Sequence, residues 1–273
     1  MISPETTAEK TAVTLLTDFG LRDPYVAEMK AVILSICPDA TLVDITHEIP
    51  KYDVKMGAYL LAQSVAYFTG RTVHLAVVDP GVGGGRKPIA IETKSTILIG
   101  PDNGLLIPAA EKLGLKHVYQ IENPLYPPSK ISRTFHGRDI FAPAAGHLAR
   151  GMSPTDLGRE ISNYRKISFP KPKITRGKIT GEVLYIDSFG SIITNITAEL
   201  LEQADVKYGT ALKVAWGNIR PKKVRFLETY SLAQTGSLLA TVGGSGFMEI
   251  SANMADAAKK FKVRRGMRVT VSV

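Results

Sequence analysis

The sequence predicts an α/β protein with an N-terminal αβ domain, whose largely parallel sheet is covered by helices, and a C-terminal, mostly-β, barrel-like domain. In the first half of the chain, short apolar runs alternate with amphipathic helical runs. In the second half, short strand-like runs follow one another with glycine turns between them. Between the halves lies the segment 167–177, which mixes Pro with Lys and Arg. We therefore expect two domains, residues 1–170 and residues 171–273.

Two helices of the N-terminal half are expected to begin at an acidic cap. Asp23 with Pro24 at the first helical position predicts a helix over Tyr25–Ile36. Asp53 is the expected cap of a second helix, in which apolar residues recur at helical spacing as far as Tyr67. Two further helices are expected, one ending near Leu113 and one over Ile140–Arg150. The strands expected between them are Val13–Leu16, Thr41–Ile45, Val73–Val78, Ile89–Glu92, Thr96–Ile99 and His117–Ile121, with a proline-rich loop over 123–128.

The C-terminal half contains few segments that resemble long helices. Its strand-like runs are short and rich in β-branched residues, which is typical of an antiparallel barrel. The expected strands are Ile179–Ile186, Ile192–Ile196, Leu212–Trp216, Ser237–Thr241, Phe247–Ile250 and Met267–Val273.

Composition places the chain among ordinary soluble globular proteins, with 44% hydrophobic and 22% charged residues. The net charge of +9 is scattered and lacks interleaved aromatic residues, so we expect a solvated basic surface and no nucleic-acid partner. The chain has no long apolar run and its first twelve residues are polar, which predicts no membrane segment and no leader. The single Cys37 excludes an internal disulfide and agrees with a cytoplasmic location.

The segment VHLAVVDPGVGGGR (73–86) is the strongest local indication of a site. An apolar run ends at Asp79, four of the next six positions are glycine, and Arg86 closes the loop. In open α/β sheets ligands bind outside the carboxyl ends of the strands, where this loop is expected to present a carboxylate and a guanidinium. As an isolated Asp-Pro-Gly, the same residues would be an ordinary turn with Asp79 as its cap.

Other polar residues follow predicted strands and leave two interpretations open. Asp18 could accept hydrogen bonds from both hydroxyls of a ribose diol, or could cap the turn at Gly20. Carboxylates at strand ends together with histidines could also bind a divalent metal, but no close ligand spacing supports this. These residues are Asp18, Asp44, Asp79, Asp102, His47 and His136. In the second half, the loops 187–190 and 243–247 combine glycines with Asp187, Phe189 and Ser245, and each could be a simple hairpin turn.

Seven segments together resemble the family of S-adenosylmethionine hydroxide adenosyltransferases, which are related to fluorinating and chlorinating adenosyltransferases. The segments are LLTDFG (15–20), ICPDATLVDITHEI (36–49), VVDPGVGGGR (77–86), IGPDNGLL (99–106), TFHGRD (134–139), IDSFGSIITNI (186–196) and GGSGFMEISAN (243–253). The resemblance spans nearly the whole chain. It implies an αβ domain, a β-barrel domain and a homotrimer whose sites lie between neighbouring subunits.

The resemblance also implies a role for individual residues. The family's catalytic Asp-Arg-His set corresponds to Asp79, Arg86 and His136, and its ribose-binding carboxylate to Asp18. The remaining residues implied to bind S-adenosylmethionine are Asp23, Asp187, Phe189, Asn195 and Ser245. No metal and no cofactor are implied.

One departure from the related halogenating enzymes favours water as the nucleophile. Those enzymes have Tyr at the position of Asp79 and Ser at that of Gly137, and they lack the Arg and His of the set. The expected reaction is therefore attack of water on the 5′ carbon of S-adenosylmethionine, which gives adenosine and L-methionine. Two alternatives remain at this point, a non-catalytic module that binds S-adenosylmethionine or adenosine and a metal-dependent phosphohydrolase.

Overall fold

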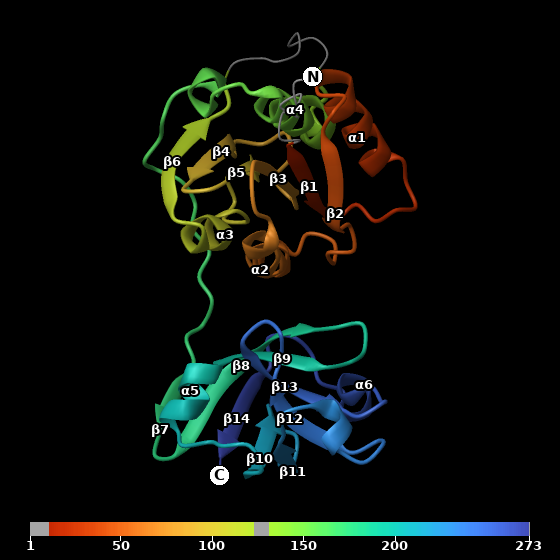
Figure 1. Ribbon diagram of the computed structural model, residues 1–273, viewed down its shortest axis with the longest axis vertical. Helices are drawn as coiled ribbons and strands as arrows, with labels where there is room; N and C mark the ends of the chain where they lie inside the picture. The colour runs from red at the N-terminus through yellow and green to blue at the C-terminus, as the bar shows by residue number, and fades with distance from the viewer. Residues whose placement is uncertain (1–10, 123–130, 273) are drawn as a thin grey trace, which may run out of the picture. The chain divides into compact units, whose positions relative to one another are not determined.

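The computed structural model describes residues 11–122 and 131–272, and it divides the chain into two compact units, with the boundary between Ile167 and Ser168 (Figure 1). The proline-rich loop expected over 123–128 and most of the polar N-terminal segment lie outside the described residues. Within those residues, no helix is both long enough and apolar enough to cross a membrane.

The N-terminal unit is built on a six-stranded sheet in the order β2-β1-β3-β5-β4-β6. Its strands are β1 (Ala12–Thr17), β2 (Thr41–Thr46), β3 (Thr72–Val77), β4 (Pro88–Thr93), β5 (Ile97–Pro101) and β6 (Leu115–Gln120). The pairs β1–β2, β1–β3 and β3–β5 are parallel, whereas β4 is antiparallel to both of its neighbours. The predicted largely parallel sheet is confirmed. Strand β4 runs in the opposite direction because the turn after Thr93 is short, and a short turn can join only antiparallel strands.

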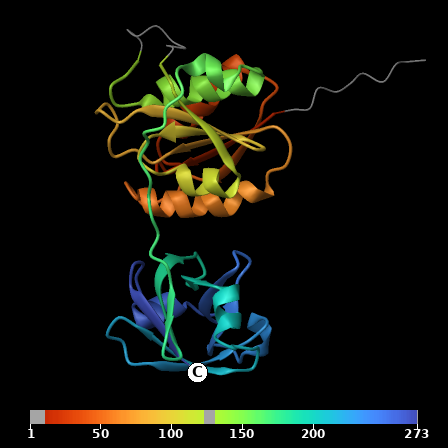
Figure 2. The ribbon, with the colours of Figure 1, turned by 90° about the vertical axis from the view of Figure 1, so that its left-hand side faces the viewer.

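Helices cover both faces of this sheet, as predicted. Figures 1 and 2 show α1 (Tyr25–Ile36) and α4 (Ala142–Arg150) on one face, and α2 (Val54–Ser64) and α3 (Ile107–Lys112) on the other. Apolar side chains of α1 and α4, such as Met29, Ile33 and Leu148, are buried against strands whose residues are apolar on both faces. This packing fixes the strand ends from which the candidate site residues extend.

The two predicted helix caps differ in outcome. The Asp53 side chain accepts a hydrogen bond from Met56 N at 3.0 Å, as expected of an N-cap. The prediction that Asp23 caps α1 is wrong, because Pro24 takes the cap position with a helical backbone and no side chain caps the helix. Asp23 is instead exposed in the preceding loop.

The helical segment that ends at Arg150 begins at Gly137, three residues before the predicted start at Ile140. A π-helical turn, η3 (Gly137–Phe141), precedes α4 and follows directly from His136. Such turns accommodate an extra residue in a helix and are frequent at functional sites. Here the π-helical turn brings His136 to the start of a buried helix.

The C-terminal unit is a closed barrel, as predicted. Its order is β14-β10-β11-β12-β13-β9-β8-β7, and an additional pairing of β14 with β8 closes the ring. The strands are β7 (Lys173–Thr175), β8 (Lys178–Ile186), β9 (Ile192–Thr197), β10 (Ala211–Trp216), β11 (Lys222–Phe226), β12 (Leu238–Val242), β13 (Phe247–Ala252) and β14 (Arg268–Ser272). Two short helices, α5 (Ala198–Gln203) and α6 (Ala257–Phe261), complete the unit, whose interior is filled by apolar side chains around the fully buried Trp216.

Two strands of the barrel are not predicted from the sequence. β7 lies inside the segment interpreted as a linker, and β11 coincides with a cluster of basic residues. In β11, Val224 and Phe226 are buried whereas Lys223 and Arg225 are exposed. This is the alternation of a strand with one solvent-exposed face. Two apolar residues are too few to give a recognisable strand pattern in the sequence.

Candidate active site

Asp79 is held at the carboxyl end of the sheet by a glycine-rich loop. The loop leaves the end of β3 and turns back toward β4 over residues 79–86. Gly83 has φ +74°, and a Cβ atom there would lie 2.2 Å from the carbonyl oxygen of Arg133. Glycine is therefore required at this position, because its backbone touches the segment that leads to His136.

Asp79 and Arg86 form a buried ion pair across this loop. Arg86 Nε donates to Asp79 Oδ2 at 2.9 Å, and Arg86 Nη2 donates to the same oxygen. Both side chains are only 4% exposed, and the Arg86 guanidinium stacks on the ring of Phe141, with 5.2 Å from Cζ to the ring centre. Since the pair is desolvated and fixed from two sides, its charges are preorganised.

His136 completes the group through the same guanidinium. Arg86 Nη2 lies 2.7 Å from His136 Nδ1, and because guanidinium can only donate, Nδ1 accepts this hydrogen bond. Burial, followed by the charge of Arg86, lowers the pKa of His136, although Asp79 and Asp139 oppose this shift. His136 is therefore neutral at pH 7 and carries its proton on Nε2, which makes it a hydrogen-bond donor toward any ligand.

The second carboxylate oxygen of Asp79 has no hydrogen-bond partner among the described residues, although it is buried. Buried polar atoms are nearly always paired, so an unpaired anionic oxygen indicates a place for a water or a ligand hydroxyl. In this arrangement Asp79 Oδ1 is the available acceptor and His136 Nε2 the available donor.

Asp18 leaves the sheet beside Asp79. β1 and β3 are parallel neighbours with Thr17 opposite Val77, so the residues that follow them emerge at the same edge. Asp18 is 6% exposed, and its Oδ2 accepts a hydrogen bond from Tyr52 N at 2.8 Å. Lys51 Nζ donates to the Asp18 carbonyl oxygen. The carboxylate is thus held in a fixed place close to the strand end.

The other strand-end carboxylates considered for a metal are engaged elsewhere. Asp44 pairs with Lys30 at 2.6 Å, and Asp102 accepts a hydrogen bond from Arg165 N at 2.7 Å. Among the described residues, no three His, Cys, Asp or Glu side chains form a group that could hold a metal ion.

An aromatic cluster beside these residues is not singled out by the sequence. Phe19, Tyr25 and Phe135 pack edge to face, with ring centres 5.3 to 6.0 Å apart. A Cβ at Gly137 would lie 3.2 to 3.4 Å from Met29, Phe135 and Phe19, so the cluster leaves little space for a larger residue there. Phe19 and Phe135 are each next to a predicted site residue, Asp18 and His136, and this is the signal that could have indicated the cluster.

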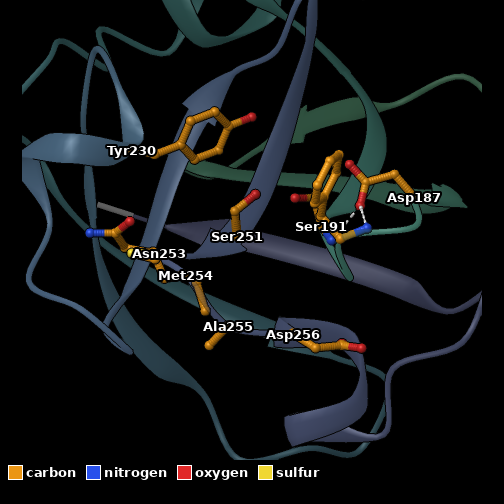
Figure 3. Close-up of a pocket in the computed structure, with 10 residues that line it drawn as sticks. Asp187, Ser191, Tyr230, Ser251, Asn253, Met254, Ala255 and Asp256 are labelled. Carbon is orange, nitrogen blue, oxygen red and sulfur yellow. Dashed lines mark hydrogen bonds between the residues drawn. The ribbon is translucent and has the colours of Figure 1, made fainter.

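The C-terminal unit contains a pocket of about 590 Å³, within the usual range for small-molecule sites (Figure 3). Asp187 and Phe189 line it together with Tyr230 and the segment 251–256. Asp187 Oδ1 accepts hydrogen bonds from Phe189 N at 3.0 Å and Ser191 N at 2.8 Å, which holds the loop tight. The ring of Phe189 is 82% exposed at the pocket.

Tyr230 and Glu249 form a polar contact at this pocket that sequence reasoning missed. The Tyr230 hydroxyl donates to Glu249 Oε1. Burial raises the pKa of Glu249, and burial together with the nearby Glu249 carboxyl raises that of Tyr230. Glu249 interrupts an otherwise uncharged strand, β13, and this is the signal that could have indicated it.

The remaining predicted site residues lie apart from these two groups. Both ends of the Asn195 side-chain amide bind backbone groups of the barrel, since Oδ1 accepts from Glu182 N at 2.7 Å and Nδ2 donates to the Pro170 carbonyl at 2.6 Å. Ser245 lies in the turn between β12 and β13, outside the lining of the pocket. Asp23 is in the exposed loop before α1.

Each of the two units matches a domain of one known protein family. Models of the N-terminal and C-terminal domains of SAM hydroxide adenosyltransferases match residues 13–158 and 181–270. A protein of Salinispora arenicola named (R)-S-adenosyl-L-methionine hydrolase is 38% identical, over 95% of this chain and 97% of the relative. A fluorinase of Actinoplanes sp. is 28% identical, over 95% of this chain and 97% of the relative. A crystal structure of a conserved protein from Thermotoga maritima has a TM-score of 0.92 at 36% identity and covers 96% of this chain and 100% of that one.

Proposed function

This chain belongs to the SAM hydroxide adenosyltransferase family, and from that premise we propose that it hydrolyses S-adenosyl-L-methionine to adenosine and L-methionine. The observation that carries the proposal is the buried contact of Asp79, Arg86 and His136, with one carboxylate oxygen left without a partner. A carboxylate oxygen that can accept a proton, a fixed cation and a neutral hydrogen-bond donor can together orient and activate a water molecule for attack on carbon.

In the proposed reaction the water oxygen bonds to the 5′ carbon of the adenosyl group while the bond from that carbon to sulfur breaks. The sulfur keeps the bonding electrons, so the sulfonium cation leaves as neutral methionine and needs no proton. Catalysis then depends on holding, desolvating and activating a water in line with the leaving group.

The three side chains divide this task. Asp79 Oδ1 accepts a hydrogen bond from the attacking water and receives its proton as the bond forms. The Arg86 guanidinium stabilises the negative charge that develops on the water oxygen. His136 accepts from Arg86 through Nδ1 and donates through Nε2, which orients the nucleophile. No metal or cofactor takes part in this proposal.

The proposed binding residues come from both units. Asp18 accepts hydrogen bonds from the ribose diol, and Asp23 lies near the methionine end. Asp187 and Phe189 hold the methionine end and the adenine at the pocket, with Asn195 and Ser245 assigned to the same part of the substrate. We further propose a homotrimer in which neighbouring subunits complete each site, and a cytoplasmic location in keeping with the single Cys37.

Water is the proposed nucleophile in preference to a halide, although some relatives are named fluorinases. The Asp79 carboxylate beside the nucleophile repels a halide by on the order of a few kcal/mol at the effective dielectric of a partly buried site. No 5′-halogenated adenosine is expected when chloride or fluoride is added.

The decisive experiment is turnover in oxygen-18 water. Incubation with S-adenosyl-L-methionine should place the label on the 5′ hydroxyl of adenosine, with EDTA having no effect. Binding of the substrate without product would instead indicate a binding module, and loss of activity on chelation would indicate a metal-dependent hydrolase. Absence of label in the adenosine that forms would contradict direct attack of water.

A further inference from the structure

A buried histidine that the proposed mechanism does not use, His47, contacts the residue that precedes Asp18. His47 follows β2 and is 3% exposed, and Thr17 is the fully buried last residue of β1. His47 Nδ1 lies 2.8 Å from Thr17 Oγ1. Asp18 is the next residue after Thr17, so this contact is one residue away from the carboxylate proposed to bind the ribose.

His47 also holds the other end of the same turn. Its backbone carbonyl accepts a hydrogen bond from Gly20 N at 2.7 Å, where Gly20 has φ +69°. Inside the turn, Phe19 N donates to Thr17 Oγ1 at 3.1 Å. The segment Thr17–Gly20 is therefore attached to His47 on both sides of Asp18, once through a side chain and once through the backbone.

The other ring nitrogen of His47 faces a carboxylate. His47 Nε2 lies 3.0 Å from Asp44 Oδ1, and Lys30 Nζ lies 2.6 Å from Asp44 Oδ2. Burial raises the pKa of Asp44, but its interactions with Lys30 and His47 together outweigh burial and lower the pKa. A carboxylate facing Nε2 favours the proton on that nitrogen, which leaves Nδ1 to accept from the Thr17 hydroxyl.

We propose that His47 is a positioning residue, which acts through Thr17 and Gly20 to hold the Asp18 carboxylate in the geometry that binds the ribose diol. The proposal rests on the diol contact of Asp18 in the proposed function. It predicts that removing the His47 contact weakens recognition of the diol specifically, whereas the chemical step at Asp79 is not affected.

The sequence of β1 offers a matched control. Thr14 Oγ1 lies 2.8 Å from His74 Nδ1, and both residues are fully buried in the middle of the sheet. The two pairs share the same residue types, distance and strand, but the Thr14–His74 pair is three residues before the turn. Loss of either pair should reduce stability, whereas loss of the Thr17–His47 pair alone should alter diol recognition.

The test compares inhibition by adenosine with inhibition by 2′-deoxyadenosine, which lacks one hydroxyl of the diol. In the wild-type protein the missing hydroxyl should weaken binding about tenfold, the value for one hydrogen bond to a charged group. His47→Leu and Thr17→Val should bring this ratio close to one and raise KM, with kcat nearly unchanged. His47→Asn restores an acceptor near the position of Nδ1 and should recover most of the ratio. In the double variant His47→Leu/Thr17→Val, the ratio should be no lower than in either single variant.

The outcomes separate this proposal from the one on which it depends. If wild-type protein distinguishes the two nucleosides and the folded Thr17→Val protein still does, His47 has no positioning role, even where His47→Leu fails to fold. Thr14→Val must keep the wild-type ratio, since a loss there would show that any weakening of β1 has the same effect. If wild-type protein does not distinguish them, the diol contact of Asp18 is itself overturned, and the role of His47 with it.

Discussion

The polar side chains of the N-terminal site are buried and hydrogen-bonded to one another. The pocket of the C-terminal barrel is instead lined in part by exposed apolar side chains. Asp79 and Arg86 are 4% exposed, but Phe189 is 82% and Met254 87% exposed. A buried, charged group is already organised before a ligand arrives, and this favours the transition state. An exposed ring gains contacts only when a ligand covers it, and this favours binding. The difference implies that variants of the buried Asp79–Arg86 pair change kcat, whereas variants of the exposed groups at the barrel pocket change KM.

The largest expected effect is that of Arg86→Ala. It removes the cation that stabilises the developing negative charge, and loss of one such group costs about 10² or more in kcat. KM should change little, because this interaction strengthens only as the nucleophile becomes anionic. The measurement is steady-state turnover, followed by chromatography of adenosine, with a circular dichroism check of folding.

Arg220→Ala is the matched control for this variant, because Arg220 is exposed in the barrel and should have no effect. An Arg86→Ala protein with intact kcat and a raised KM would reverse the comparison, and Arg86 would then be a binding residue.

The next largest effect is expected for Asp18→Asn, which tests whether the N-terminal unit contributes binding as well as chemistry. The variant keeps an acceptor for Tyr52 N but loses the charge offered to the diol. A hydrogen bond to a charged group contributes about 1.5–3 kcal/mol, so KM should rise about 10- to 100-fold. Asp39→Asn, at an exposed position, is the control. A drop in kcat at unchanged KM would assign Asp18 to the chemical step.

The parts of the fold and site that could be predicted are those that depend on short, continuous segments of the sequence. The apolar run before Asp79 and the glycines after it are enough to predict a strand, a turn and a carboxylate at the sheet edge. The contact of Arg86 with His136 joins residues fifty positions apart, and no local pattern encodes it. From the residues alone His136 is only a possible metal ligand, its catalytic role is implied by the family resemblance, and its tautomer follows from the structure.

What could not be predicted depended on tertiary packing. Asp23 has the spacing of a helix cap, yet Pro24 adopts the cap conformation itself. β11 is too basic to stand out as a strand, because only its two inward residues are apolar. Tyr230 and Glu249 are nineteen residues apart and meet because the loop before β12 folds back toward β13.

A smaller effect is expected from the pH dependence of kcat. Burial and Arg86 lower the pKa of His136 below 6.5, so kcat should be constant around pH 7 and fall as the pH drops below 6.5 through the pKa of His136. Protonation removes the acceptor that Arg86 uses.

His136→Gln should lower kcat about tenfold, the value for one orienting hydrogen bond, and abolish this acidic decline. His117→Gln, an exposed histidine paired with Glu160, should keep the wild-type profile, and persistence of the decline in His136→Gln would assign it to another group.

The same lowered pKa affects stability in the same direction. The unfolded chain binds the proton at a higher pH than the folded one, so the free energy of unfolding should decrease as the pH falls below 6.5. His136→Gln removes this contribution, which thermal unfolding at pH 5 and pH 7 would measure.

The smallest effect is expected for Phe189→Ala, and it tests the C-terminal half of the comparison. Because the ring is 82% exposed, its removal should leave the melting temperature unchanged. When a ligand covers the ring, stacking contributes about 0.5–1.5 kcal/mol, so KM should rise only a few-fold while kcat stays the same. Leu232→Ala removes a side chain that is 62% exposed in the same unit but outside this pocket, and it should change neither constant. A fall in kcat for Phe189→Ala would mean that the barrel helps to align the reacting atoms, and the division of rate and binding between the two units would not hold.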